Sequence, residues 1–295
     1  MVPNPEQPVG LLMPNEHEFS YTPKDFNRVV ALIYQHAGIR LNESKMQMVY
    51  SRLSRRLRAL RMDTFSGYLD MLQANPDAEE WQQFVNALTT NLTAFFREAH
   101  HFDMLAEQIE RTRERPFRIW CAASSTGEEP YSLAMTAFEA CQSANPAVEI
   151  IASDLDTHVL ATAERGVYPL DRVEKLSLER KRGFFLKGAG PNEGKVRVKK
   201  PLRSLIDFRQ INLLSEQWPL QGQFDAIFCR NVMIYFDQPT QRQILEKMGR
   251  RLKPDGLLYV GHSENLHYMS DWYRPFGKTT YSLTERALQE WGRRS

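Results

Sequence analysis

Two segments of small and acidic residues each follow a short apolar run. The first, residues 121–130, holds a single glycine, Gly127, and ends in Glu128, Glu129 and a proline. It lacks the spacing of a dinucleotide-binding loop, and a capped helix start explains it equally well. The second ends at Asp154, where an acid accepts hydrogen bonds from ribose hydroxyls or simply caps the next helix. Together the two segments favour a nucleoside without a pyrophosphate, which suggests S-adenosylmethionine.

A third candidate segment follows another apolar run and begins with Arg230 and Asn231. If that run is a parallel strand, both side chains face the ligand cleft; the alternative is helix capping and a surface ion pair. The proline-rich motif that DNA amino-methylating enzymes carry at this place is absent. Cys229 has no histidine nearby, so we interpret it as a core residue. His100 and His101 have no partners at metal-ligand spacing, and we expect them on a helix surface and no metal site.

Arginines cluster between residues 51 and 61 without any acid among them. Apolar residues at helical spacing predict a helix that is anchored by one face and presents guanidinium groups on the other. Such groups recognise carboxylates or phosphates, so an acidic protein surface and nucleic acid both stay open, beside an ordinary solvated face. The arginines are Arg52, Arg55, Arg56, Arg58 and Arg61.

The elements that must position these residues fall into two regions after a proline-rich tail at residues 1–20. Helical periods without a strand-like segment predict an all-α domain over 21–90. Over 91–295, strands alternate with helices, which predicts a doubly wound, Rossmann-like α/β domain. Glycines and an alternating run predict a small antiparallel hairpin inserted at 184–203. We expect main strands at 117–122, 148–153, 204–212, 224–229 and 257–261, with an edge strand at 278–283.

Composition sets outer limits on the class of protein. The 295 residues are 42% hydrophobic and 25% charged, with a formal net charge of +2, which excludes wholesale disorder and favours no particular partner. Three cysteines are too few and too dispersed for a disulfide framework. No apolar run is long enough to cross a bilayer and no secretory signal is present, so we expect a cytoplasmic globular protein.

Five strings in this sequence resemble the bacterial chemotaxis receptor methyltransferases of the CheR family. They are NLTAFFRE at 91–98, ASSTGEEPYS at 123–132, ASD at 152–154, FDAIFCRNVMIYF at 224–236, and KPDG with GHSEN at 253–265. The resemblance spans about residues 22–283 and keeps the same order of helical domain, cofactor domain and β insertion.

The resemblance implies an S-adenosylmethionine-dependent enzyme with S-adenosylhomocysteine as its product. Its acceptors are glutamate side chains of methyl-accepting chemotaxis receptors, which become methyl esters. It implies a cytoplasmic monomer that is recruited to membrane receptor arrays, contacts the receptors' helical region and C-terminal tail, and neither binds nucleic acid nor inserts into the membrane. A glutamate is already ionised at neutral pH and needs no general base. The rivals are an RNA or small-molecule methyltransferase and a non-catalytic domain that only docks on receptors.

The resemblance also assigns residues. Arg97 and Tyr235 are expected at the reacting groups, Glu129 at the methionine amino group and Asp154 at the ribose. The expected cofactor contacts are Asn91, Thr93, Arg97, Glu129, Asp154, Asn212, Leu213, Arg230 and Asn231. The expected receptor contacts are Arg52, Arg55, Arg56 and Arg58, with Lys187, Gly188, Gly190, Gly194 and Arg197 in the insertion.

One position departs from the family pattern. Relatives that dock a pentapeptide use two arginines in the insertion, and Lys187 stands where one of them is expected. A lysine keeps the charge and loses the bidentate geometry, so a weaker or altered tether follows. We expect Lys187 and Arg197 to flank the turn and meet an acidic peptide residue, with the strand of Arg197 as an open edge.

Overall fold

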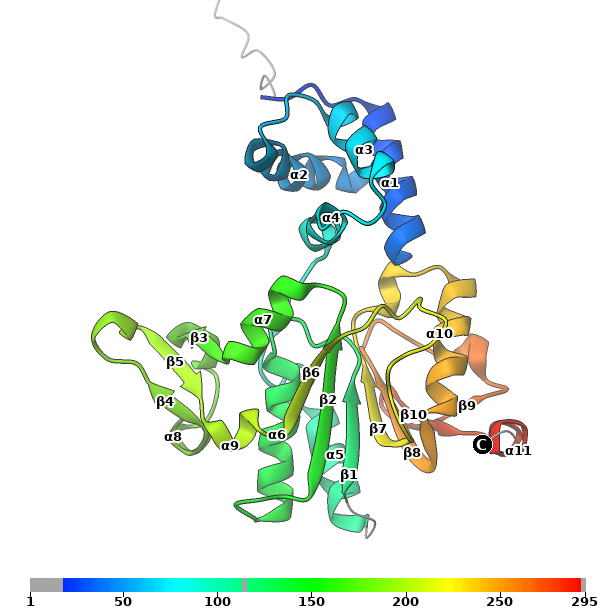
Figure 1. Ribbon diagram of the computed structural model, residues 1–295. Helices are drawn as coiled ribbons and strands as arrows, with labels where there is room; N and C mark the ends of the chain where they lie inside the picture. Colours follow the sequence, from blue (N-terminus) through cyan, green and yellow to red (C-terminus); the bar gives the residue numbers. More distant parts are fainter. Residues whose placement is uncertain (1–17, 113–115, 293–295) are drawn as a thin grey trace, which may run out of the picture.

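A mixed seven-stranded sheet organises the larger part of the protein in the computed structural model, which describes residues 18–112 and 116–292 (Figure 1). In spatial order the strands are β6 (Ile206–Gln210), β2 (Val148–Asp154), β1 (Phe117–Cys121), β7 (Phe224–Cys229), β8 (Leu252–Val260), β10 (Thr280–Leu283) and β9 (Tyr273–Gly277). The first five run parallel, and the last two are antiparallel to their neighbours. The Rossmann-like α/β prediction is confirmed. The segment predicted as an edge strand, β10, is covered by β9, which the sequence reading missed.

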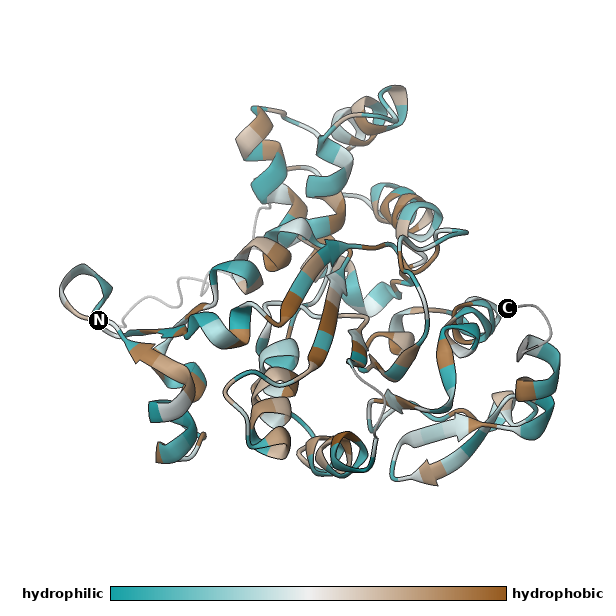
Figure 2. Cartoon of the chain, turned by 60° about the horizontal axis from the view of Figure 1, so that its bottom comes forward, coloured by the Kyte–Doolittle hydropathy of each residue, from teal (hydrophilic) through white to brown (hydrophobic). Residues whose placement is uncertain are grey.

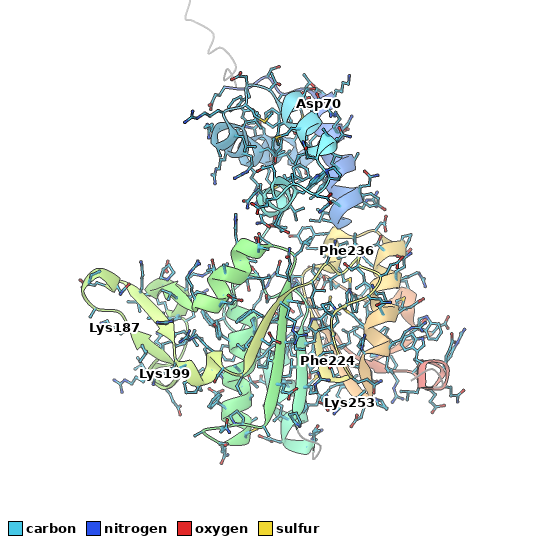
Figure 3. All side chains as sticks on the ribbon, in the orientation of Figure 1. Asp70, Lys187, Lys199, Phe224, Phe236 and Lys253 are labelled. Carbon is cyan, nitrogen blue, oxygen red and sulfur yellow. The ribbon has the colours of Figure 1, made fainter. Side chains whose placement is uncertain are left out.

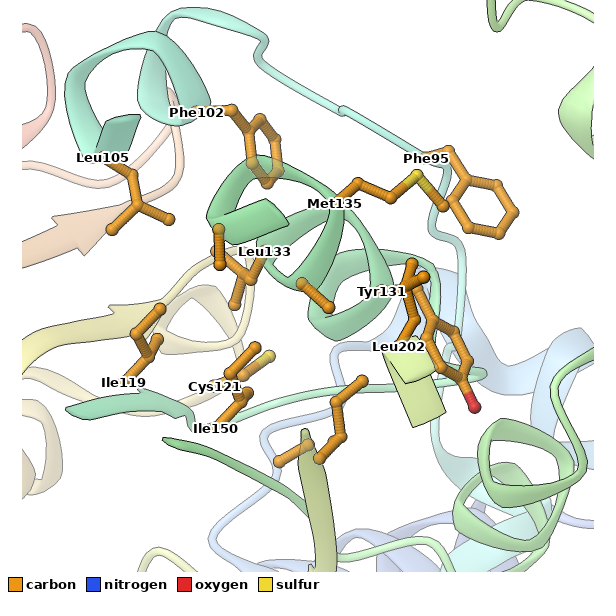
Figure 4. Close-up of a cluster of buried hydrophobic side chains, with 14 of the residues drawn as sticks. Phe95, Phe102, Leu105, Ile119, Cys121, Tyr131, Leu133, Met135, Ile150 and Leu202 are labelled. Atoms are coloured by element: carbon orange, nitrogen blue, oxygen red, sulfur yellow. The ribbon is translucent and has the colours of Figure 1, made fainter. Parts of the chain in front are cut away.

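Helices cover both faces of the sheet, because its strands are apolar on both sides (Figure 2). α5 (His100–Arg111) and α6 (Glu128–Cys141) pack on the face of Ile119 and Cys121, and Figure 4 shows Leu133 and Tyr131 of α6 in this cluster. α10 (Gln238–Arg250) and α11 (Glu285–Gly292) pack on the opposite face, where Trp120 lies. α7 (Thr157–Arg165) follows β2. No helix in the described part is long and apolar enough to span a membrane.

The inserted subdomain is larger than the predicted hairpin. Its three-stranded sheet has the order β3 (Val167–Pro169), β5 (Lys195–Val198) and β4 (Phe185–Lys187), and it projects from the sheet domain in Figure 1. The short helices α8 (Leu178–Phe184) and α9 (Lys200–Arg203) flank it. The insertion therefore begins near residue 167 rather than 184. β5 is the central strand, so the prediction that the strand of Arg197 is an open edge is wrong.

The N-terminal domain consists of helices, as predicted: α1 (Pro23–Ala37), α2 (Met46–Leu60), α3 (Phe65–Ala74) and α4 (Glu80–Leu88). Thr22 and Asp25 form a capping box at the start of α1. Residues 1–17 of the predicted tail lie outside the described residues. The predicted boundary at residue 20 is too late, because Phe19 is buried and packs edge-on against Phe65.

The helical domain sits on the carboxyl ends of the parallel strands. Figure 3 shows Phe236 at this junction, below α1. Hydrogen bonds that join the two parts include those from Tyr34 Oη to Asp237 Oδ2 at 2.7 Å, Arg40 N to Tyr235 O at 2.9 Å, Asn212 Nδ2 to His36 O at 3.2 Å and Gln82 Nε2 to Leu155 O at 3.0 Å. Folds of this kind bind ligands at the carboxyl ends of the strands. The helical domain therefore covers this edge of the sheet and forms a roof over it.

Candidate functional site

A cavity of about 430 Å³ lies between the helical domain and the carboxyl ends of the strands. Its volume falls in the range of small-molecule sites. Every residue predicted to contact the cofactor or the reacting groups lines it: Asn91, Thr93, Arg97, Glu129, Asp154, Asn212, Leu213, Arg230, Asn231 and Tyr235. The structure thus brings together residues that are spread over more than a hundred positions of the chain.

Asp154 closes β2 with one face toward this cavity. Its carboxylate accepts hydrogen bonds from the backbone N–H groups of Ser125, at 2.8 Å, and Asp156, at 3.0 Å. The helix cap considered for this segment belongs to Asp156, which accepts from the first N–H groups of α7. Burial raises the pKa of Asp154 to about 6, against the lowering effect of these backbone bonds. Asp154 therefore has unused acceptor capacity at the position where a ribose is expected.

The loop before α6 is shaped by close contacts rather than by a side-chain cap. Gly127 has a φ of 99°, and a Cβ there would lie 2.7 Å from Tyr168 Oη. α6 begins without a side-chain cap, so the alternative reading of a capped helix start is wrong. Glu128, buried in the first turn, pairs with Arg172 of the inserted subdomain, which also donates to Thr93 O. The insertion thus holds two segments of the cavity wall.

Arg230 is the centre of a buried charge cluster. Its side chain is 1% exposed, and its guanidinium donates to Glu129 Oε2 at 2.6 Å and lies 3.2 Å from Glu98 Oε2. Burial acts to raise the pKa of Glu98, but the Arg230 charge and a hydrogen bond from His262 lower it to about 2. Arg230 therefore already faces two carboxylates, whereas Arg97, which also lines the cavity, donates from Nη1 to Leu92 O and faces no carboxylate among the described residues.

Several residues around the Arg230 charge cluster have a strained backbone. Phe96, Glu98, Ser125 and Asn231 all have left-handed φ angles between 47° and 59°, although none is a glycine. Non-glycine residues in this conformation cost free energy and concentrate at functional sites. Buried Glu264 fixes the turn after β7, since it accepts from the backbone N–H groups of Asn231, Met233 and Gly261. Desolvation raises its pKa, against these hydrogen bonds.

Glu98, Glu264 and His101 are site-supporting residues that the sequence reading missed. Glu98 and Glu264 belong to two of the quoted strings but received no role. His101 does not lie on a helix surface as expected, because it is fully buried with Nε2 2.9 Å from Thr279 Oγ1. Burial and the neighbouring Arg230 charge lower its pKa to about 3. His101 is therefore uncharged at neutral pH, and its Nδ1 lies 3.7 Å from Glu98 Oε2 of the Arg230 cluster.

The helical domain supplies a cavity wall that no motif predicted. Arg40 and Lys45 are exposed cations of the loop between α1 and α2, and they line the cavity beside Ile39, Leu41, Asn42 and Met48. No sequence pattern predicted this wall, because the segment carries no acidic or glycine-rich motif.

The helix that carries the clustered arginines, α2, presents only some of their guanidinium groups freely to solvent, although a free arginine face was expected. Arg56 makes a bidentate pair with Glu80, and Arg58 makes one with Glu18. Arg52 donates to the backbone carbonyl of Thr89 at 2.5 Å. Acids from outside the helix therefore compensate Arg56 and Arg58, contrary to the expectation. Within residues 18–112 and 116–292, neither Arg55 nor Arg61, which follows the last residue of α2, forms a side-chain hydrogen bond or ion pair, so Arg55 is the member within the helix with a guanidinium to offer a partner.

The insertion separates the two cations that were expected to act together. Arg197 pairs with Leu186 across β5 and β4, and Lys187 pairs with Val196. Directly opposed residues share a face, and neighbours along a strand alternate. Lys187 and Arg197 therefore point to opposite faces, contrary to the expectation. Gly188 closes the turn, since a Cβ there would lie 2.0 Å from the carbonyl oxygen of Asn192.

The cavity fits S-adenosylmethionine by its donor set. Asp154 offers acceptors for ribose hydroxyls, and Glu129, partly exposed to the cavity, has acceptor capacity beyond its bond to Arg230 for an ammonium group. In the described ranges no group of histidine, cysteine, aspartate and glutamate is placed to hold a metal ion.

Comparison with known proteins assigns the chain. Residues 24–89 match the all-alpha domain of CheR methyltransferases, and residues 91–282 match their SAM binding domain. The chain is 57% identical over 267 residues to chemotaxis protein methyltransferase 2 of Pseudomonas aeruginosa, covering 90% of this chain and 95% of that protein. It is 49% identical over 281 residues to the chemotaxis protein methyltransferase of Salmonella typhimurium, covering 95% and 97%. The enzyme of that name from Escherichia coli is 48% identical over 276 residues, covering 94% and 96%. This chain therefore belongs to the CheR family and is an S-adenosylmethionine-dependent methyltransferase of chemotaxis.

Proposed function

We propose that the chain transfers the methyl group to glutamate side chains in the helical cytoplasmic region of chemotaxis receptors and forms glutamyl methyl esters. The charge of the cavity carries this proposal. Its acids, Glu129 and Asp154, are engaged by Arg230 and by backbone N–H groups, whereas the cations Arg40, Lys45 and Arg97 also line it. Such a site attracts a carboxylate as the acceptor.

The reaction asks little acid–base chemistry of the protein. When bound, S-adenosylmethionine supplies a methyl group on a positively charged sulfur. A glutamate side chain, with a reference pKa of about 4.3, is already a nucleophile at neutral pH. Arg97 orients the incoming carboxylate, Tyr235 packs at the reacting end, and the roof of the helical domain excludes water. Alignment of this kind accounts for several kcal/mol of a barrier.

Methyl esters distinguish this function from its rivals. Receptor-containing membranes incubated with the enzyme and methyl-labelled S-adenosylmethionine should release labelled methanol on treatment with base. Label that resists base indicates nitrogen methylation. Label that is incorporated into RNA indicates an RNA methyltransferase. Failure to bind S-adenosylmethionine indicates a docking domain without catalysis. Each of these three outcomes contradicts the proposal.

Arg55 should contribute to receptor binding, because its guanidinium is free for an acidic partner. We expect Arg55→Ala to lower the rate of receptor methylation several-fold at low ionic strength and less at high salt, with the affinity for S-adenosylmethionine unchanged. Arg111→Ala, at an exposed arginine of α5 near the start of β1, is the matched control and should have no effect. Equal rates for the Arg55 variant and the wild type at low salt would show that this face of α2 is an ordinary solvated surface that does not bind the receptor.

We also propose that the insertion holds a C-terminal receptor peptide through Arg197 and the outer edge of β4. Arg197 and Leu186 are exposed on one face, and β4 pairs only with β5 among the described strands, which leaves its other edge for strand addition. In a titration with C-terminal receptor peptides, Arg197→Ala should abolish binding and Lys187→Ala should largely preserve it. The reverse order would show that Lys187 carries the tether.

A further inference from the structure

Two of the large apolar side chains that are most exposed in the described chain line the same cavity. Leu92 is 77% exposed and Ile234 is 54% exposed, and both line the cavity. Leu178, Leu186 and Phe276 are comparably exposed but do not line it. A single exposed apolar residue needs no explanation, whereas two exposed side chains that line one cavity offer apolar surface to a molecule that enters it.

Both side chains are held in place by their neighbours. Leu92 lies between Asn91, whose amide donates to Asp156 at 2.9 Å, and Thr93, whose carbonyl accepts from Arg172. Ile234 belongs to the 3₁₀ turn Met233–Tyr235, which Glu264 fixes through Met233 N at 2.8 Å. Ordered backbone on both sides therefore keeps two apolar side chains in solvent, where they do not serve the core.

The position of these residues identifies what covers them. Any acceptor has to pass the exposed part of the cavity lining, and among the large apolar side chains of that lining Leu92 and Ile234 are the exposed ones, so they are available to the chain that presents the target carboxylate. The accompanying cations, Arg40 and Lys45, are complementary to an acidic acceptor. The occupant thus needs a carboxylate for the cavity and an apolar side chain beside it.

We propose that Leu92 and Ile234 form an apolar rim that receives an apolar side chain located one helical turn from the target glutamate on the receptor helix. This inference rests on the proposed function. Residues three or four apart share a helix face and lie about 5–6 Å apart, so one can enter the cavity while the other packs on the rim. The rim therefore selects among glutamates by the apolar residue next to them.

The test compares kinetics with a receptor cytoplasmic fragment. For the Leu92→Ser, Ile234→Ser double variant we expect the KM for the fragment to rise about tenfold, as burial of one aliphatic side chain implies. The Kd for S-adenosylmethionine by calorimetry should stay within twofold. The single variant Leu92→Met keeps the apolar surface and should retain a near wild-type KM. Leu178→Ser, at a 68% exposed leucine of α8, is the matched control and should also leave the KM near that of the wild type.

A substitution in the receptor provides the second arm. Serine in place of the apolar residue one turn from the target glutamate should raise the KM of the wild-type enzyme and add nothing to that of the double variant. An unchanged KM in the double variant, or a full additional loss in the combination, overturns the rim while the wild type still forms methyl esters. Absence of methyl esters with the wild-type enzyme overturns the proposed function itself.

Discussion

Arg230→Met is expected to lower the free energy of unfolding by about 3–5 kcal/mol, the range for removing one partner of a buried ion pair. The substitution leaves Glu98 and Glu129 without the cation that both of them pair with. It also removes the donor to the backbone carbonyl of Arg97. The affinity for S-adenosylmethionine should fall as well, because Glu129 and Arg97 both line the cavity.

Urea unfolding measures the stability effect, and a control separates it from the loss of an ordinary arginine. Arg111→Met removes an exposed pair with Glu107 and should change stability little. A folded Arg230→Met protein with wild-type stability and cofactor affinity would mean that the buried charge cluster does not organise the site.

Asp154→Asn should weaken S-adenosylmethionine binding about 10–100-fold, the equivalent of about 1.5–3 kcal/mol for hydrogen bonds to a charged group. The amide has one acceptor oxygen, and the backbone N–H groups of Ser125 and Asp156 compete for it. Calorimetry measures the Kd, and Asp207→Asn, at an exposed aspartate of β6, is the control. Unchanged affinity in a folded variant would remove Asp154 from the site.

The titration of Asp154 should also appear in the pH dependence of S-adenosylmethionine binding and of stability in the wild-type protein. Ribose hydroxyls donate to the ionised form, so affinity should be highest above pH 6 and fall as pH drops through the Asp154 pKa of about 6. Stability of the ligand-free protein responds in the opposite direction. A carboxyl group whose pKa is raised on folding binds more protons in the native state, so its contribution to stability declines as pH rises from about 4 to 6. Asp154→Asn should flatten both profiles.

The sequence was informative where function depends on residues that follow strands. Segments such as 121–130 and 228–236 lie at carboxyl ends of parallel strands, and those ends meet at one edge whatever the loops do. Asp154, Arg230 and Asn231 could be predicted for that reason, whereas the other cavity residues were assigned through the family resemblance: Asn91, Thr93, Arg97, Asn212, Leu213 and Tyr235. The strand β3 was not predicted, because its three residues end in proline and are too few to show an alternation of apolar and polar residues.

Interactions across long sequence distances were beyond a local reading. The arginine helix looked uncompensated because Glu18 and Glu80, which pair with Arg58 and Arg56, lie outside the local window. His101 looked exposed because its burial depends on contacts with Thr279, far away in the chain. Helical periodicity reports one face of an element and not the partner that covers the other.

The roof over the cavity has a consequence for the order of events on a receptor. Hydrogen bonds on several sides hold the helical domain across the site, and under the proposed function donor and acceptor share the cavity beneath it. Under the proposed docking, a receptor helix on the rim covers the opening through which spent donor departs. Each transfer then ends with release of the helix before fresh donor enters. On these two proposals, we expect modification of several glutamates on one receptor to be distributive rather than processive, with the proposed tail contact at Arg197 setting how soon the next encounter occurs.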